Sequence, residues 1–160
     1  SVIDPKQEKL LEEMVEKRQR FGRKNAKGFY DYPEKGPKKL WPGITEIVGE
    51  AKPAESFDVE EMKQRFLAIQ ALETARCVEE GVITDVREGD VGSILGFGFA
   101  PFSGGTLSYI DFMGVKNFVA LCEKLAGKFG PRFAPNALLK EMATKNETFY
   151  GRFAPQTKAA

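Results

Sequence analysis

Residues 115–129 read VKNFVALCEKLAGKF, a stretch whose apolar side chains recur every three or four positions. This spacing places them on one face of an α-helix, the arrangement of a helix that packs against a hydrophobic core. The predicted core face comprises Val115, Phe118, Val119, Cys122, Leu125, Ala126 and Phe129. Gly130 and Pro131 follow at once and predict the end of this helix.

Other helices are predicted on both sides of this stretch. Asp58 is a typical N-cap, Glu61 is placed to complete a capping box with it, and Gly81 predicts the end of a long helix. Further helices are expected over residues 4–22, 85–95, 106–113 and 135–142, with a loop from residue 146 onward. Because no segment alternates polar and apolar residues over a sustained run, we expect an all-α fold, an irregular antiparallel helix bundle.

Charge and turn residues divide the chain into two parts. Residues 1–40 carry 11 basic and 7 acidic side chains, whereas residues 41–160 carry 13 and 16. Residues 22–57 contain five glycines and four prolines without hydrophobic periodicity, which predicts a long irregular connection. We therefore expect residues 1–40 to belong to a separate unit and residues 41–160 to form a helical domain.

The composition excludes several classes of site. The chain has no histidine, so a Ser-His-Asp triad, a Cys-His dyad or a His-containing zinc site cannot be built from it alone. A net charge of +1 gives no overall attraction to nucleic acid or to an anionic membrane. Cys77 and Cys122 form no disulfide or metal-binding pattern, no apolar run is long enough to span a membrane, and no signal peptide is evident. These features predict a cytoplasmic protein without a metal site.

The glycine-rich segment 96–105 begins like a nucleotide-binding turn, but it lacks the third glycine and follows a predicted helix. We expect instead that its glycines let the loop backbone approach a neighbouring element closely, while three aromatic side chains fill the contact. The glycines are Gly96, Gly98, Gly104 and Gly105, and the aromatic residues are Phe97, Phe99 and Phe102. If the loop is exposed, it favours a homo-oligomer.

A basic cluster, Arg23, Lys24 and Lys27, lies between two glycines and precedes several aromatic residues. These side chains could contact a phosphate group, and the neighbouring aromatic rings could stack on single-stranded nucleic acid. The balanced charge of the chain disfavours nucleic acid, and a solvated basic turn anchored by the aromatic residues is the default interpretation. Glu73 adjoins the apolar stripe of the long helix, where we expect partial burial and a structural hydrogen bond rather than catalysis.

Three stretches together resemble the C-terminal part of the 3-hydroxyacyl-CoA dehydrogenase family. The sequence GRKNAKGFYDY at 22–32 is similar to the end of that family's helical domain, and residues 65–81 resemble its long first helix. Residues 90–114 resemble its signature through Asp90, Pro101, Asp111 and the glycines between and after them. The resemblance covers nearly the whole chain and implies a fold like the C-terminal domain of 6-phosphogluconate dehydrogenase.

The order of these stretches implies that residues 1–40 are the tail and linker of one helical repeat and that a complete second repeat follows, as in multifunctional fatty-acid β-oxidation enzymes. In that family a preceding domain binds NAD and supplies a catalytic histidine. The resemblance therefore implies that this chain binds no cofactor by itself and is a catalytically incomplete part of an NAD-dependent oxidoreductase. Gln64 stands where the family has asparagine, and Thr106 stands where proline is usual.

The role implied for the chain is structural. It would pack against the NAD-binding domain and the first helical repeat of the same enzyme, whose substrate is an acyl-CoA. The interface loop would comprise Gly96, Gly98, Phe99, Pro101, Gly104, Gly105 and Asp111. The alternative is a free-standing helical interaction module that binds a CoA-like anion through Arg23, Lys24 and Lys27.

Overall fold

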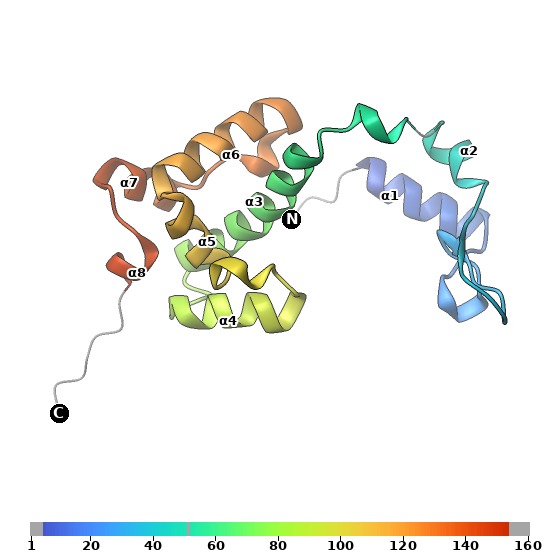
Figure 1. Cartoon of the computed structure of the whole chain (residues 1–160), viewed down its shortest axis with the longest axis horizontal. Coiled ribbons are helices and arrows are strands. Elements are labelled where there is room, and N and C mark those ends of the chain that lie inside the picture. Colours follow the sequence, from blue (N-terminus) through green and yellow to red (C-terminus); the bar gives the residue numbers. More distant parts are fainter. Residues whose placement is uncertain (1–4, 51, 154–160) are drawn as a thin grey trace. The chain divides into compact units, whose positions relative to one another are not determined.

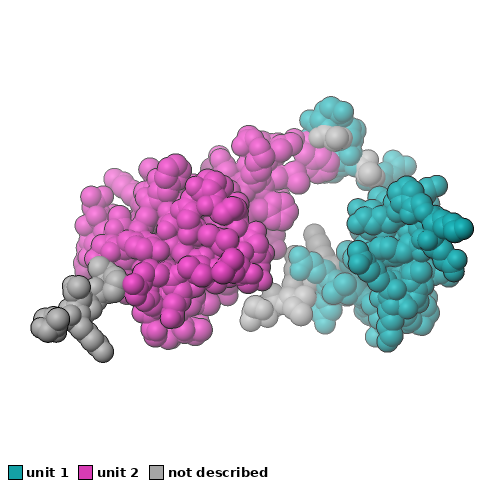
Figure 2. All heavy atoms as spheres, turned by 60° about the horizontal axis from the view of Figure 1, so that its bottom comes forward, with its two compact units in different colours: residues 1–56 teal, residues 57–160 magenta. Residues whose placement is uncertain are grey.

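The computed structural model describes residues 5–50 and 52–153. The chain forms two compact units, residues 1–56 and 57–160, coloured teal and magenta in Figure 2. Residues 41–56 therefore belong to the first compact unit. The division expected after residue 40 is a different boundary, the end of one helical repeat. That boundary stays a prediction.

The first unit begins with α1 (Pro5–Glu12), which continues as a π-helical turn over Glu13–Lys17. After a 3₁₀ turn at Arg23–Asn25, β1 (Tyr30–Asp31) pairs antiparallel with β2 (Lys39–Leu40). The unit ends with α2 (Ile44–Val48) and a 3₁₀ turn at Ala54–Ser56. The helix predicted over residues 4–22 is present over 5–17 and ends earlier than expected, and residue 4 lies outside the described residues.

Arg20 holds the turn and the two strands of the first unit together. Its Nε donates to the carbonyl of Gly28 at 2.7 Å, and its guanidinium forms an ion pair with Asp31. The same guanidinium lies 4.2 Å from the centre of the Trp41 ring, and the backbone N–H of Trp41 donates to the carbonyl of Phe29. A buried cation is tolerated here because a carbonyl, a carboxylate and an aromatic face replace its water.

The second unit contains six described α-helices (Figure 1). They are α3 (Val59–Glu79), α4 (Val86–Phe97), α5 (Thr106–Met113), α6 (Val115–Phe129), α7 (Ala137–Lys145) and α8 (Phe149–Arg152). Short 3₁₀ turns at Pro101–Ser103 and Pro131–Phe133 join α4 to α5 and α6 to α7. In Figure 1, α4 and α6 lie on opposite sides of this unit, with α3 and α5 between them. The chain is mainly α-helical, as predicted.

The core of the second unit forms where α6 meets α3 and α5. Five residues of the predicted α6 face are buried: Val115, Phe118, Val119, Cys122 and Leu125. Small side chains on α3, among them Ala68, Ala71 and Ala75, are fully buried and allow neighbouring helices to approach closely. The Tyr109 ring of α5 makes edge-to-face contacts with Phe118 and with Phe99, which favour one arrangement of the rings.

The start of α3 agrees with the sequence in part. The Asp58 carboxylate accepts the N–H of Glu61 at 3.0 Å, which confirms the predicted N-cap. The Glu61 carboxylate forms an ion pair with Lys128 of α6 rather than the second half of a capping box. The loop predicted from Asn146 onward is wrong, because Thr148 caps α8 by accepting the N–H of Gly151 at 3.0 Å.

Within residues 5–50 and 52–153, no helix has both the length and the apolar composition needed to cross a bilayer.

Replacing Phe118 with alanine tests the assignment of the core. Phe118 is fully buried and its ring contacts Tyr109 of α5, so Phe118→Ala is expected to lower the free energy of unfolding by about 3–5 kcal/mol. Urea denaturation followed by circular dichroism measures this loss. Phe97→Ala is the matched control, because Phe97 is 57% exposed, and it should change stability by no more than about 0.5 kcal/mol. Equal losses for the two variants would contradict the core described here.

Candidate functional site

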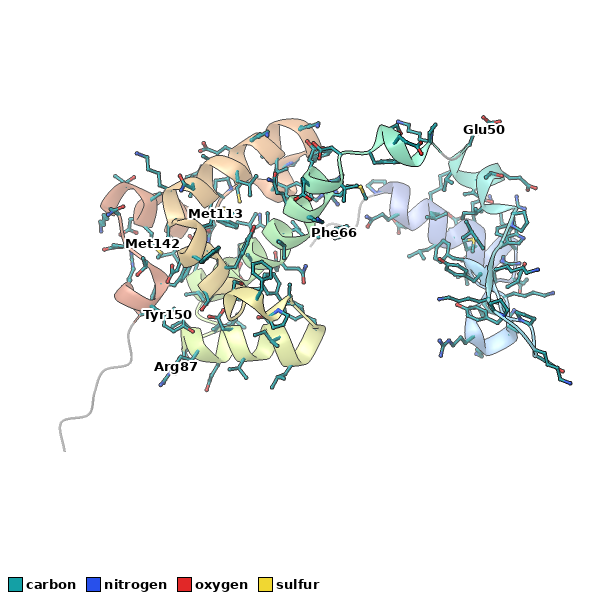
Figure 3. All side chains as sticks on the ribbon, in the orientation of Figure 1. Glu50, Phe66, Arg87, Met113, Met142 and Tyr150 are labelled. Carbon is teal, nitrogen blue, oxygen red and sulfur yellow. The ribbon has the colours of Figure 1, made fainter. Side chains whose placement is uncertain are left out.

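The segment 90–114 is organised around the carboxylate of Asp90, a residue of α4 that is 2% exposed. Its Oδ1 accepts the N–H of Leu107 at 2.7 Å. Its Oδ2 accepts the N–H of Ser108 at 3.1 Å and the hydroxyl of Ser108 at 2.6 Å. The phenol of Tyr150 on α8 also donates to Oδ2, at 2.8 Å, and Figure 3 shows Tyr150 beside the amino-terminal end of α4. One buried carboxylate therefore connects α4, α5 and α8.

A carboxylate suits this position because α5 begins with backbone N–H groups that have no partner inside the helix. Gly105 precedes α5 and has no side chain with which to cap it. Ser93 of α4 adds a second contact by accepting the N–H of Thr106 at 3.3 Å and donating to the carbonyl of Asp90 at 2.7 Å. The cap of α5 is thus supplied by α4, not by the residues immediately before α5.

Gly105 provides the room that this cap requires. Its φ of +130° is rarely adopted by residues with a side chain, and a Cβ atom at this position would lie 2.5 Å from the Cβ of Asp90. Any other residue at 105 would push the loop away from α4 and lengthen the hydrogen bonds to Leu107 and Ser108. The close approach between the loop backbone and a neighbouring element, which the glycines of the loop predicted, therefore occurs between Gly105 and α4.

The Asp111 carboxylate plays a similar part at the start of α8. It accepts the N–H of Phe149 at 2.8 Å and the N–H of Tyr150 at 3.0 Å. Burial raises the pKa of the Asp111 carboxyl above its usual value, while the two backbone N–H groups act in the opposite direction. Asp111 therefore connects α5 to α8, the helix that also supplies the phenol for Asp90.

A third carboxylate caps α7 from the end of α3. Glu79 Oε1 accepts the N–H of Leu138 at 2.6 Å. The neighbouring Arg76 guanidinium donates to the carbonyls of Arg132 and Ala134 at 2.9 and 3.1 Å. These contacts hold the turn before α7 against α3. Three helices of the second unit therefore begin at carboxylates that belong to other helices.

The remaining residues of the predicted interface loop have separate surroundings. Phe99 is buried against Tyr109, and the Phe102 ring, although largely exposed, also makes an edge-to-face contact with Tyr109 at 6.2 Å. Phe97 is exposed, so the expectation that all three rings fill one contact is confirmed for two of them and wrong for Phe97. Phe97 is the last residue of α4, whereas Phe102 lies in the short turn after it, beside the buried Tyr109. Gly96 lies within α4 beside open space, so no close approach occurs there. Gly98 ends α4 with a φ of +74°, Gly104 has a φ of +88°, and Pro101 begins the 3₁₀ turn between them.

The three basic candidates of the first unit lie in and just after one tight turn. Arg23 and Lys24 lie in the exposed 3₁₀ turn, where the Arg23 guanidinium is 5.9 Å from the centre of the Tyr32 ring. Asn25 stabilises the turn, because its side chain accepts the N–H of Phe21 and donates to the carbonyl of Gln19. Lys27 instead lines a groove beside the two strands.

Two residues of α3 singled out from the sequence are on its surface. Gln64 is exposed. Glu73 is also exposed and forms an ion pair with Arg76 at 3.0 Å, so the expected partial burial of Glu73 is wrong. One turn along the helix separates the two partners, and their geometry leaves the Glu73 carboxylate in solvent.

The two cysteines are free thiols with little nucleophilic character. Burial raises the pKa of the Cys122 thiol to about 12, and burial also raises the pKa of Cys77. A thiol needs a lowered pKa to act as a nucleophile near neutral pH. In the part of the chain that the structure describes, no cluster of three or more carboxylate or thiol groups is arranged to hold a metal ion.

The carboxylates of the segment 90–114 are thus engaged by N–H and O–H donors and position helices. The sequence placed Asp90 and Asp111 in one motif, but it did not identify Ser108 and Tyr150 as hydrogen-bond donors to Asp90. It also did not identify Glu79 as the acceptor at the start of α7. Tyr150 is 60 residues from Asp90, and no local pattern connects positions so far apart.

Removing the Asp90 carboxylate tests its structural role. Asp90→Ala leaves four donor contacts without their acceptor, so we expect the free energy of unfolding to fall by about 3 kcal/mol. Urea denaturation measures the change. Glu88→Ala removes the same charge from an exposed position of α4 and should shift stability by less than about 0.5 kcal/mol. A small effect at Asp90 would show that the carboxylate does not organise α5 and α8.

Two glycine-to-alanine variants test the close approach at Gly105. Gly105→Ala is expected to destabilise the chain by more than about 2 kcal/mol, because the methyl group meets Asp90 at an unfavourable φ. Gly127→Ala is the matched control: Gly127 lies within α6 with open space around it, so alanine should stabilise the chain by about 0.5–1 kcal/mol. Thermal denaturation compares the two, and a neutral effect at Gly105 contradicts the packing described.

Comparison with known proteins shows one similar protein in detail. No family model matches the chain. Over 133 residues the chain is 44% identical to the fatty acid oxidation complex subunit alpha of Shewanella amazonensis (strain ATCC BAA-1098 / SB2B). The match covers 82% of this chain and 19% of that protein, so the chain spans about a fifth of the length of the relative. Over most of its length, the chain is therefore similar to one region of a fatty-acid oxidation enzyme.

Proposed function

We propose that the chain is the C-terminal helical region of an NAD-dependent 3-hydroxyacyl-CoA dehydrogenase, the part of a multifunctional fatty-acid β-oxidation enzyme that converts 3-hydroxyacyl-CoA to 3-oxoacyl-CoA. In this proposal the region itself is structural. It packs against the NAD-binding domain and the first helical repeat of the same enzyme and holds them in place. We also propose that this enzyme is cytoplasmic.

The observation that carries the structural role is the use made of Asp90 and Asp111. In this segment, which resembles the dehydrogenase signature, both carboxylates accept hydrogen bonds from the first turns of other helices. A general base needs a carboxylate that faces bound substrate, and neither group has that freedom here. The similarity to a fatty acid oxidation complex subunit supports the choice of enzyme.

The residues of this chain do not fit NAD. The segment that begins Gly96-Phe97-Gly98 follows helix α4 rather than a strand, and Gly98 serves as the left-handed end of that helix. Its next residue, Phe99, is buried in the core. A dinucleotide turn instead places a helix N-terminus toward the pyrophosphate. The proposal therefore assigns NAD to another part of the enzyme.

The surface of α4 suits a packing role. Val91 and Leu95 are 55% and 80% exposed, and Phe97 at the end of the helix is also exposed. Val91 and Leu95 are four residues apart and share one side of the helix. Apolar side chains grouped in this way lose contact with water when another domain covers them.

Two assays test the proposal. The first gives the isolated chain acetoacetyl-CoA and NADH and follows NADH absorbance, and we expect no turnover because the chain has no histidine to serve as the acid or base. The second uses the Shewanella amazonensis relative with its matching segment deleted. We expect low dehydrogenase activity from the truncated protein alone and a clear increase when this chain is added.

Variants of the added chain show whether the increase depends on the fold described above. Asp90→Ala should restore less activity than the unmodified chain, while Glu88→Ala should restore as much. Turnover by the isolated chain would falsify the structural role. Full activity of the truncated relative, with no effect of the added chain, would contradict the assignment to this enzyme region.

A further inference from the structure

The first unit contains a groove beside β1 and β2 that the proposed function does not use. Its volume is about 650 Å³, within the range of sites that hold small molecules rather than macromolecules. It is lined by residues of the segment 26–42, which includes the end of the basic turn and both strands.

The charge of the groove is positive. Lys27, Lys35 and Lys39 line it, and none of the three takes part in an ion pair among the described residues. Asp31 is the acidic residue of the lining, and its carboxylate is paired with the buried Arg20 guanidinium. Since that pair neutralises Asp31, the lysines leave a net attraction for an anion.

The rest of the lining is mostly apolar and includes a flat surface. The groove is also lined by Tyr32, Pro33, Pro37, Leu40 and Pro42, and the Tyr32 ring has the Arg23 guanidinium 5.9 Å from its centre. An aromatic ring stacks on planar bases of any sequence, and proline rings add apolar contact. A simple inorganic anion would leave this surface unused, whereas a ligand with both phosphate and an aromatic ring contacts it.

The backbone that carries these side chains is held in place by hydrogen bonds. Gly22 and Lys27 exchange two backbone hydrogen bonds of 2.7 and 3.0 Å, and the Tyr32 N–H donates to the carbonyl of Ala26 at 2.9 Å. Lys39 belongs to the strand pair, opposite Asp31. A site whose frame is already formed loses less conformational entropy on binding a ligand.

We propose that this groove binds a mononucleotide-type ligand, with its phosphates near Lys27, Lys35 and Lys39 and its base against Tyr32 and the neighbouring prolines. The ligand class comprises nucleoside diphosphates and the adenosine phosphate end of coenzyme A. The inference does not depend on the dehydrogenase proposal, because it concerns direct binding to this chain.

Calorimetric titration of the full chain with ADP, and separately with coenzyme A, tests the groove. Saturable binding of one molecule per chain is expected, with an affinity that falls as salt is added. Lys35→Ala/Lys39→Ala should weaken binding by roughly tenfold or more, since each lysine is placed to contact a phosphate. Tyr32→Ala should weaken binding of ADP while leaving binding of inorganic tripolyphosphate unchanged.

The matched control is Lys24→Ala/Lys38→Ala. It removes two positive charges from exposed lysines of the same unit that do not line the groove, and the Lys38 ammonium lies 4.5 Å from the centre of the Tyr30 ring instead. The control should bind ADP within roughly twofold of the unmodified chain, because it preserves the groove. Circular dichroism spectra and melting curves establish that each variant is folded.

Several outcomes overturn the proposal. Absence of saturable binding by the folded chain excludes the site. Equal loss in both lysine pairs shows attraction to overall charge rather than to the groove. If tripolyphosphate binds as tightly as ADP and Tyr32→Ala has no effect, the proposed contact between the base and Tyr32 is wrong. An oligonucleotide that binds more tightly and is not displaced by ADP assigns the surface to nucleic acid.

Discussion

The arrangement of helices in the second unit depends on one buried carboxylate, which requires hydrogen-bond donors. Asp90 is 2% exposed and forms no ion pair within residues 5–50 and 52–153, so its charge is balanced by two N–H groups of α5, the Ser108 hydroxyl and the Tyr150 phenol. To reach those donors, α5 must start directly against α4, and this is possible because Gly105 has no side chain. The positions of α4, α5 and α8 thus follow from one constraint.

The same solution recurs where other helices begin. Asp111 supplies the acceptor for α8 and Glu79 supplies it for α7, so the helices exchange caps through space. This explains why a segment rich in glycine and carboxylates, which is typical of many active sites, has a structural role here. It also agrees with the proposed division of labour in a fatty-acid oxidation enzyme, where this region positions other domains.

The described part of the first unit has little apolar core, and polar and cation–π contacts of one buried arginine stabilise it instead. Arg20 is satisfied by the carbonyl of Gly28, the Asp31 carboxylate and the Trp41 ring, and these contacts support a small strand pair. By neutralising Asp31, the buried arginine also determines the charge of the adjacent groove. A structural ion pair and a proposed ligand site are therefore connected through one carboxylate.

The sequence alone determined where most helices form and which face of α6 is buried, because both follow from residue spacing and from local caps such as Asp58. It also determined that no imidazole chemistry resides in this chain. Only the tertiary structure decided what Asp90, Asp111 and Glu79 do, since their donors are 17 to 60 residues away and no local pattern encodes them. It likewise decided that α8 forms, that Phe97 and Phe102 are exposed, and that Lys27 lines a groove beside the strand pair. Helix formation depends on neighbours within a few residues, whereas caps between helices and grooves depend on which elements pack together.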